Sequence, residues 1–264
     1  MRILVTAVII QARMGSTRLP GKVLRDLSGK PVLWHLVRRL KKASLPDVIL
    51  VATTTNPEDD LIEKACVEWD IPVFRGEPDD VLKRYCDSVV FLEKTYRRID
   101  CIVRITADCP LIDPRVVDRV VSEMVSGGYD YASNTDPPTF PDGLDVEVIS
   151  RDALFAANEK ATLLSDREHV TPYIRKNPEF NKTNIRNPAD LSALRWTLDT
   201  PDDYEFINKV YACLYNPRRI FLMTDILNLL KKNPGLLKIN SHIPRNEGYE
   251  KSLSRDRKLR GDSS

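Results

Sequence analysis

The stretch ILVTAVIIQARMGSTRLPGKVL, residues 3–24, joins a short apolar run to a basic loop that contains glycine. The run Ile3–Ile10 is short and rich in β-branched residues, which predicts a buried strand. Glycines let backbone N–H groups approach an anion closely, and Arg and Lys side chains supply the opposite charge. The loop is therefore suited to a nucleoside triphosphate, and a solvated basic loop is the alternative. Its glycines and cations are Gly15, Gly21, Arg13, Arg18, Lys22 and Arg25.

Short β-branched runs alternate with helical patterns after this loop. Such alternation with short connections predicts an α/β fold, in which helices cover both faces of a mostly parallel sheet in three layers. Ligands of such sheets bind at the carboxyl ends of the strands, where both the basic loop and the segment Ala107–Pro114 fall. The later strands are expected at Asp47–Thr55, Ile71–Gly76 and Asp100–Thr106, with helices beginning at Pro31 and after Asp113.

The pattern changes at Tyr129, where the chain becomes rich in Asp, Pro and Gly. Alternating polarity over Leu144–Ile149 predicts an antiparallel excursion within residues 129–190. A strand at Leu194–Leu198 and a helix capped by Thr200 are expected to complete the sheet. We therefore expect one domain over residues 1–244, followed by a polar, flexible tail over 245–264 that has almost no apolar periodicity.

Composition excludes several classes of protein. The 264 residues carry a formal charge of +2, and the tail accounts for that surplus, so no basic face for nucleic acid is predicted. Five cysteines without a C-x-x-C pair favour reduced thiols in a cytoplasmic protein rather than disulfides or zinc. The apolar start is shorter than the roughly 20 residues of a membrane span, and no signal-peptide cleavage site follows it.

Two aspartates are candidate magnesium ligands. Asp108 follows the expected strand at Asp100–Thr106, and Asp199 follows the one at Leu194–Leu198. Carboxylates from two strand ends, with phosphate oxygens filling the other positions, are a donor set that Mg²⁺ accepts. Each aspartate could instead cap a turn or helix, which is a common role for Asp at these positions. Neither a P-loop nor a dinucleotide-binding fingerprint is present.

Several motifs, in order along residues 5–210, resemble the cytidylyltransferases that make CMP-activated acidic sugars. These motifs are IIQARMGSTRLPGKVL, VRITADCPLIDP, GLDVEVIS, REHVTPYIR and LRWTLDTPDDYEFI. The chain resembles the acylneuraminate and 3-deoxy-manno-octulosonate enzymes, and is most similar to the SpsF-like branch of spore coat polysaccharide biosynthesis. The resemblance implies the fold of nucleotide-diphospho-sugar transferases, and a Mg²⁺-dependent transfer of CMP from CTP to an acidic sugar with release of pyrophosphate.

The resemblance also implies roles for individual residues. Lys22 and Arg13 would be catalytic, Asp108 and Asp199 would hold Mg²⁺, and the excursion would close over the acceptor and form a homodimer. Arg167 and His169 suit an acidic acceptor, although a histidine on a helix surface or at an interface is an equally good reading of His169. The implied nucleotide-binding residues are Gln11, Ala12, Arg13, Gly15, Ser16, Arg18, Lys22, Thr106, Ala107 and Asp108, and the implied acceptor-binding residues are Asp145, Glu147, Arg167 and His169.

The sequence departs from the octulosonate enzymes at residues 106–110, which read TADCP. Those enzymes typically carry a glutamine-glycine-aspartate-glutamate run there, so the aspartate is kept but its neighbours differ. The acceptor and the base therefore stay open. The alternatives are a sugar-1-phosphate nucleotidyltransferase that uses another NTP, a glycosyltransferase that consumes a nucleotide sugar, and a nucleotide-binding protein without activity.

Overall fold

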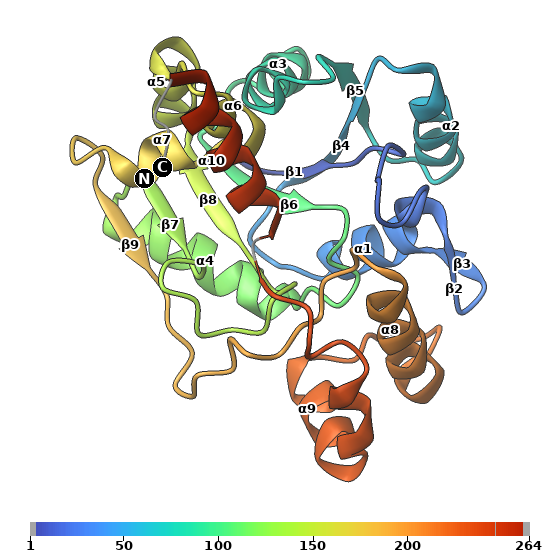
Figure 1. Ribbon diagram of the computed structural model, residues 1–264. Coiled ribbons are helices and arrows are strands. Elements are labelled where there is room, and N and C mark those ends of the chain that lie inside the picture. The colour runs from blue at the N-terminus through green and yellow to red at the C-terminus, as the bar shows by residue number, and fades with distance from the viewer. Residues whose placement is uncertain (1–3, 246, 261–264) are drawn as a thin grey trace.

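Strand β1 divides the core into two layers. In the computed structural model, which describes residues 4–245 and 247–260, β1 spans Thr6–Gln11 inside a seven-stranded sheet. Side chains alternate between the two faces of a strand, so Val8 and Ile10 pack into one apolar cluster while Ala7 and Ile9 pack into another. Helices cover both faces, which confirms the predicted three-layer α/β architecture (Figure 1).

The sheet has the strand order β5-β4-β1-β6-β8-β7-β9. Strands β5, β4, β1 and β6 pair in parallel, whereas β8 runs antiparallel to both β6 and β7. The predicted antiparallel excursion is therefore confirmed. A separate hairpin of β2 (Asp26–Leu27) and β3 (Lys30–Pro31) follows the basic loop. The other strands are β4 (Val48–Thr54), β5 (Val73–Gly76), β6 (Cys101–Thr106), β7 (Tyr131–Ser133), β8 (Glu147–Ser150) and β9 (Lys182–Asn184).

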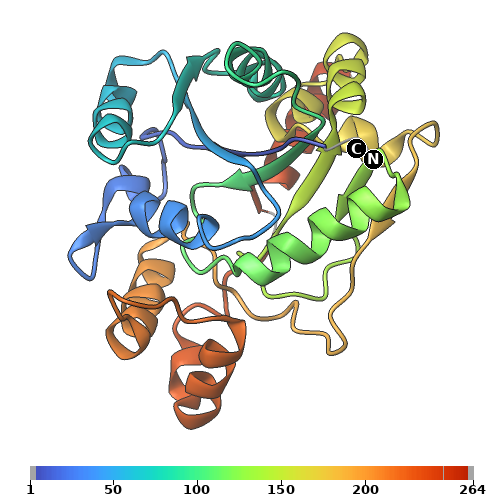
Figure 2. The same cartoon turned by 180° about the vertical axis from the view of Figure 1, so that it is seen from behind.

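Two groups of helices cover the two faces. Figure 2 shows α1 and α4 on one side of the sheet, where α2, α8 and α9 also contribute to the larger apolar cluster. On this side lie α1 (Val32–Leu40), α2 (Asp60–Glu68), α4 (Pro114–Gly127), α8 (Pro201–Leu214) and α9 (Met223–Lys232). The smaller cluster includes residues of α3 and α5, and the elements of that side are α3 (Val81–Leu92), α5 (Arg151–Lys160), α6 (Leu164–His169) and α7 (Pro172–Lys176). Three short 3-10 helices are η1 (Lys22–Leu24), η2 (Pro57–Asp59) and η3 (Pro234–Lys238).

The helices begin where local capping rules place them. The Asp113 side chain accepts a hydrogen bond from the Arg115 N–H at 2.9 Å, so α4 begins at the predicted position. Thr200 caps α8 through a reciprocal pair of bonds with Asp203. Within the described residues, no helix combines the length and apolar character needed to cross a membrane.

The expected strand at Leu194–Leu198 is wrong in detail. This segment makes one isolated bridge, between Asp142 and Arg195, and no regular strand. Gly143 explains the close approach: its φ is +104°, and a Cβ there would lie 2.6 Å from the carbonyl carbon of Trp196. The segment therefore reaches the sheet edge as extended chain packed against a glycine turn.

Over residues 247–260 the expected flexible tail is replaced by a helix, while residues 246 and 261–264 of that expected tail lie outside the described residues. Residues Glu247–Arg260 form helix α10, which packs against α6. Its buried residues Ser252 and Asp256 are polar. Apolar periodicity therefore could not reveal the docked face of this helix.

Candidate active site

The basic loop connects β1 to η1 and is held by backbone and carboxylate contacts. The Gly21 N–H donates to the Met14 carbonyl at 3.1 Å, and the Met14 N–H donates to Asp59 at 2.6 Å. Gly21 adopts a left-handed conformation with φ 66°, which glycine accepts without strain. The turn at Gly21 ends the loop and places Lys22 at the start of η1, facing the carboxyl edge of the sheet.

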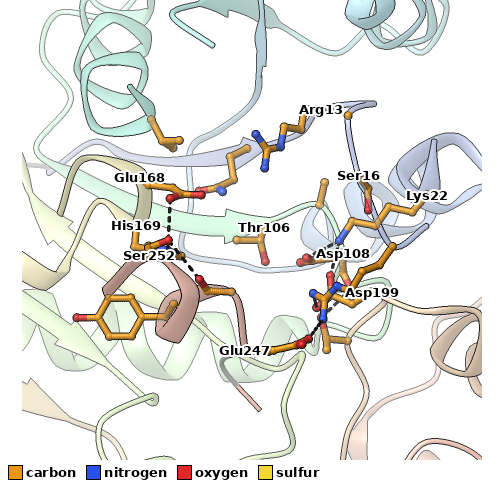
Figure 3. Close-up of a pocket in the computed structure, with 18 of the residues that line it drawn as sticks. Arg13, Ser16, Lys22, Thr106, Asp108, Glu168, His169, Asp199, Glu247 and Ser252 are labelled. Atoms are coloured by element: carbon orange, nitrogen blue, oxygen red, sulfur yellow. Dashed lines mark hydrogen bonds and ion pairs between the residues drawn. The ribbon is translucent and has the colours of Figure 1, made fainter. Parts of the chain in front are cut away.

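Lys22 connects the two aspartates. Its Nζ lies 2.9 Å from Asp108 Oδ2 and 2.7 Å from Asp199 Oδ1. The two carboxylates are therefore no farther apart than two hydrogen bonds, although 91 residues separate them in the chain. Figure 3 shows both aspartates converging on Lys22 at one end of the pocket.

Arginines occupy the other side of Asp199. Arg18 Nη2 lies 2.9 Å from Asp199 Oδ2, and Arg195 Nη2 lies 3.5 Å from the same oxygen. Arg195 is itself held by Asp203, at 2.8 Å from Nε to Oδ1. Asp199 thus faces three cations. The buried ion pair with Asp203 fixes the position of Arg195, and through it that of Asp199.

Charge pairing decides the protonation states here. Burial by itself raises the pKa of Asp108, but the charge of Lys22 and hydrogen bonds from Thr106 and Lys22 outweigh it and bring that pKa down to about 2. Burial likewise lowers the pKa of Lys22, while Asp108 and Asp199 outweigh burial and raise it. The aspartate is therefore anionic and the lysine cationic near neutral pH.

The donors fit a magnesium ion that is completed by substrate. Mg²⁺ is usually bound by one or two carboxylates together with substrate phosphates, and Asp108 and Asp199 supply two such carboxylates at adjacent positions. Over residues 4–245 and 247–260, no cluster of three or more His, Cys, Asp or Glu side chains is suited to a metal. The described residues therefore offer two carboxylates here, and the other ligands of a metal would come from water or substrate.

A cavity of about 790 Å³ extends from this cluster, which is within the usual size range of ligand pockets. Arg13 makes no hydrogen bond or ion pair with any described residue, so its guanidinium is available to a ligand. All the implied nucleotide-binding and metal-binding residues line this cavity: Gln11, Ala12, Arg13, Gly15, Ser16, Arg18, Lys22, Thr106, Ala107, Asp108 and Asp199.

Two of the implied acceptor-binding residues also line the cavity. Asp145 Oδ1 lies 2.6 Å from Arg245 Nη2. Burial and the neighbouring Asp142 raise the pKa of Asp145 to about 7, against the opposing charge of Arg245. Burial, followed by the charge of Arg104, lowers the pKa of His169 to about 4. His169 is therefore neutral near physiological pH in this arrangement, without a bound ligand.

Glu147 and Arg167, the other two, do not line the cavity. Glu147 lies opposite Arg104 in the register between β6 and β8, and its carboxylate forms a buried ion pair with that arginine. Its other oxygen accepts from the hydroxyls of Tyr131 and Thr171 at 2.5 and 2.7 Å. Glu147 is therefore a structural partner of Arg104, which does line the cavity.

Arg167 is fully engaged away from the cavity. Its Nε donates to Asp80 at 2.6 Å, and its Nη atoms donate to Asn158 and to the Ala161 carbonyl. Asp80 is the N-cap of α3, while Asn158 and Ala161 lie at the end of α5. Arg167 therefore ties three helices together and does not line the cavity.

Sequence reasoning missed several residues of the cavity wall. Arg104 lies inside the motif VRITADCPLIDP and Asp142 directly precedes GLDVEVIS, so attention to charged residues near the strand ends could have found them. Arg195, four residues before Asp199, carried the same signal. The wall residues near the C-terminus gave no such signal, because residues 245–264 are expected to form a tail. These wall residues are Pro244, Glu247, Gly248, Tyr249, Lys251, Ser252 and Arg255.

Two relatives match nearly the whole chain. An uncharacterised protein of Methanocaldococcus jannaschii is 37% identical over 89% of this chain and 94% of its own length. The spore coat polysaccharide biosynthesis protein SpsF of Bacillus subtilis is 33% identical over 86% of this chain and 94% of its own. Each alignment covers nearly the whole of both proteins, so the chain and each relative have little sequence outside one common domain.

Solved structures agree with the fold. A cytidylyltransferase from Leptospira borgpetersenii superposes with a TM-score of 0.81 at 34% identity, over 89% of this chain and 97% of that one. CMP:2-keto-3-deoxy-manno-octonic acid synthetase in complex with CTP has a TM-score of 0.62 at 19% identity, over 79% of this chain and 98% of that one, and so shares the fold. The profile of the family described as Cytidylyltransferase matches residues 7–223, and the chain therefore belongs to that family and is a nucleotidyltransferase.

Proposed function

We propose that this enzyme transfers CMP from CTP to an acidic sugar, with Mg²⁺ and with release of pyrophosphate, in polysaccharide biosynthesis. The observation that carries the proposal is the junction of Lys22 with Asp108 and Asp199 beside a loop that adds Arg13, which has no ion pair with a described residue, and the half-exposed Arg18. A triphosphate needs cations on one side and a metal site on the other, and this junction offers both. The CTP bound in the octonic acid synthetase structure supports the choice of nucleotide.

Each residue of the junction has a definite part in this reaction. Asp108 and Asp199 would hold Mg²⁺, which when bound neutralises phosphate charge and polarises the phosphorus that is attacked. Lys22, released from the aspartates, would move onto the phosphates together with Arg13 and stabilise the charge of the leaving pyrophosphate. The glycine-containing loop would orient the triphosphate for in-line attack by the acceptor oxygen. The protein itself contributes no nucleophile.

The acceptor is placed at the other end of the cavity. Arg104 lies there with only 13% of its side chain exposed, and such a nearly buried guanidinium suits a carboxylate. The likeness to SpsF, a spore coat polysaccharide biosynthesis protein, supports a polysaccharide precursor as the acceptor. A homodimer and a cytoplasmic location stay predictions.

The test is product analysis with a panel of substrates. The full-length enzyme is incubated with Mg²⁺, with CTP, UTP, GTP or dTTP, and with 3-deoxy-manno-octulosonate or N-acetylneuraminate, and pyrophosphate is measured. We expect CTP to give the fastest release of pyrophosphate, in the presence of an acidic sugar only. Parallel incubations replace the acidic sugar with a sugar 1-phosphate, or supply a nucleotide sugar in place of the NTP. Turnover of another NTP with the sugar 1-phosphate would favour the sugar-1-phosphate enzymes, and formation of nucleoside diphosphate from the nucleotide sugar would favour a glycosyltransferase. Binding of CTP without turnover on any acceptor would contradict the proposal.

A further inference from the structure

Helix α10 lines the cavity, although it lies outside the region that the family profile matches, residues 7–223. Figure 1 shows α10 in dark red beside α6. Six of its residues line the cavity together with the basic loop and the ends of the strands. A helix outside the matched region therefore forms part of the wall at the site of the proposed reaction.

At the nucleotide end of the cavity, α10 contacts the basic loop. The Glu247 carboxylate forms an ion pair with Arg18 Nη1, while Nη2 of the same guanidinium is held by Asp199. Both sides of the guanidinium are thus occupied by carboxylates. Glu247 is itself held by Lys251, one turn later, at 3.0 Å.

At the other end, α10 is fixed to α6 by polar contacts. The Ser252 hydroxyl donates to Glu168 at 2.7 Å and lies 3.0 Å from His169 Nε2 (Figure 3). Because that hydroxyl has one hydrogen, His169 donates to it in this arrangement. The Ser165 N–H contacts both oxygens of Asp256 at 3.4 and 3.3 Å. Docking therefore combines polar bonds of the buried Ser252 and Asp256 with an edge contact between the rings of Tyr249 and His169, whose centroids are 5.1 Å apart.

The Arg18 contact is in conflict with nucleotide binding. A phosphate oxygen and the Glu247 carboxylate need the same N–H donors, and they repel each other if both are present. Pairing with Glu247 thus removes Arg18 from the set of cations that a triphosphate would meet. The cavity under α10 still holds about 790 Å³, so the conflict lies in charge at the loop and not in filled space.

We propose that α10 is an autoinhibitory lid in which Glu247 takes the place of a nucleotide phosphate on Arg18. Binding of a metal–polyphosphate displaces Glu247, and α10 loses its anchor at that end and opens. The proposal rests on the proposed function in that it assumes a triphosphate at the basic loop. It does not depend on the base, or on the acceptor.

The experiment compares full-length wild type with Glu247→Gln, and uses Glu250→Gln as the matched control. Glu250 lies on the same helix and is exposed, and its carboxylate is absent from the cavity wall. Dissociation constants are measured by calorimetry for Mg²⁺–CTP and for Mg²⁺–tripolyphosphate, and hydrogen exchange of α10 is followed with and without each ligand. We expect Glu247→Gln to tighten binding of both ligands about threefold, the scale of one half-exposed ion pair. It should also speed exchange in α10 without ligand, and each ligand should speed that exchange in wild type. Glu250→Gln should match wild type throughout.

The outcomes separate the lid from the reaction. Weaker or unchanged binding in Glu247→Gln, or slower exchange of α10 when ligand binds, overturns the lid, and CTP turnover can still stand. If tripolyphosphate binds more tightly to Glu247→Gln while CTP gives no product with any acceptor, the lid stands and the cytidylyltransferase proposal falls. If neither ligand binds to any variant, both proposals are overturned.

Discussion

The two ends of the cavity are built on different principles. At the proposed nucleotide end, Lys22 lies between Asp108 and Asp199, and all three side chains line the cavity. At the end proposed for the acceptor, the carboxylate of Glu147 lies behind the wall and pairs with Arg104 from within the sheet. Lys22 and Arg104 are equally enclosed, with 13% of each side chain exposed. The comparison teaches that the access of the partner carboxylates to the cavity, and not the burial of the cation, separates a charge cluster for a ligand from one that belongs to the fold.

The largest expected effect tests the structural end. Glu147→Ala leaves Arg104 nearly buried without its partner, so we expect the free energy of unfolding to fall by about 3–5 kcal/mol. Urea denaturation at neutral pH measures this. The control is Glu205→Ala, which breaks an exposed pair with Lys209 and should cost less than about 1 kcal/mol. Equal, small losses in the two variants would remove the distinction between the two ends.

The next effect tests the nucleotide end. Lys22→Ala and Asp199→Ala should each reduce turnover at least ~100-fold, because each removes one preorganised electrostatic partner, while circular dichroism stays that of wild type. The control is Arg25→Ala, a cation of the same segment that lies over the Tyr204 ring and outside the cavity wall. It should keep turnover near that of wild type. Normal rates in Lys22→Ala and Asp199→Ala would refute the assignment of the site.

The convergence of the basic loop with Asp108 and Asp199 has a simple cause. Its cations and glycines are contiguous in sequence, and parallel strands bring their carboxyl ends together whatever their exact register. Asp199 reached the expected place even though its segment forms no regular strand, since the Leu198 N–H is held by the Asp108 carbonyl at 2.8 Å.

The acceptor end could not be predicted as well. Glu147 is 43 residues from Arg104 in the chain, and their pairing follows from the register of β6 with β8. The side chains of α10 dock through Ser252 and Asp256, so its sequence lacks the apolar stripe that marks a packed helix. Neither the long-range pairing of strands nor the docking of a helix through polar side chains leaves a recognisable pattern in the local sequence.

The smallest effect is a pH dependence within the acceptor end. The pKa of Asp145 rises from 3.8 to about 7 on folding, so its proton stabilises the folded state fully below pH 3.8, and this contribution is lost as the pH rises through 7. The Asp145→Asn variant has no carboxyl proton at this position, so its stability does not fall in this way as the pH rises. The free energy of unfolding of the variant minus that of wild type should therefore increase between pH 4 and 7, by at most about 2 kcal/mol because the side chain is 32% exposed. Urea titrations at each pH measure it, and a constant difference would contradict it.

The pairing of β8 with β6 has a consequence for how this enzyme could change over evolutionary time. Residues in a strand alternate between faces, so a slip of one position would turn Glu147 to the opposite side of the sheet and leave Arg104 facing Val148 or Val146. A substitution that merely repacks the strand could thus alter the electrostatic environment of a substrate. The packing of the sheet and the charge of the cavity wall are therefore tied to each other through this register.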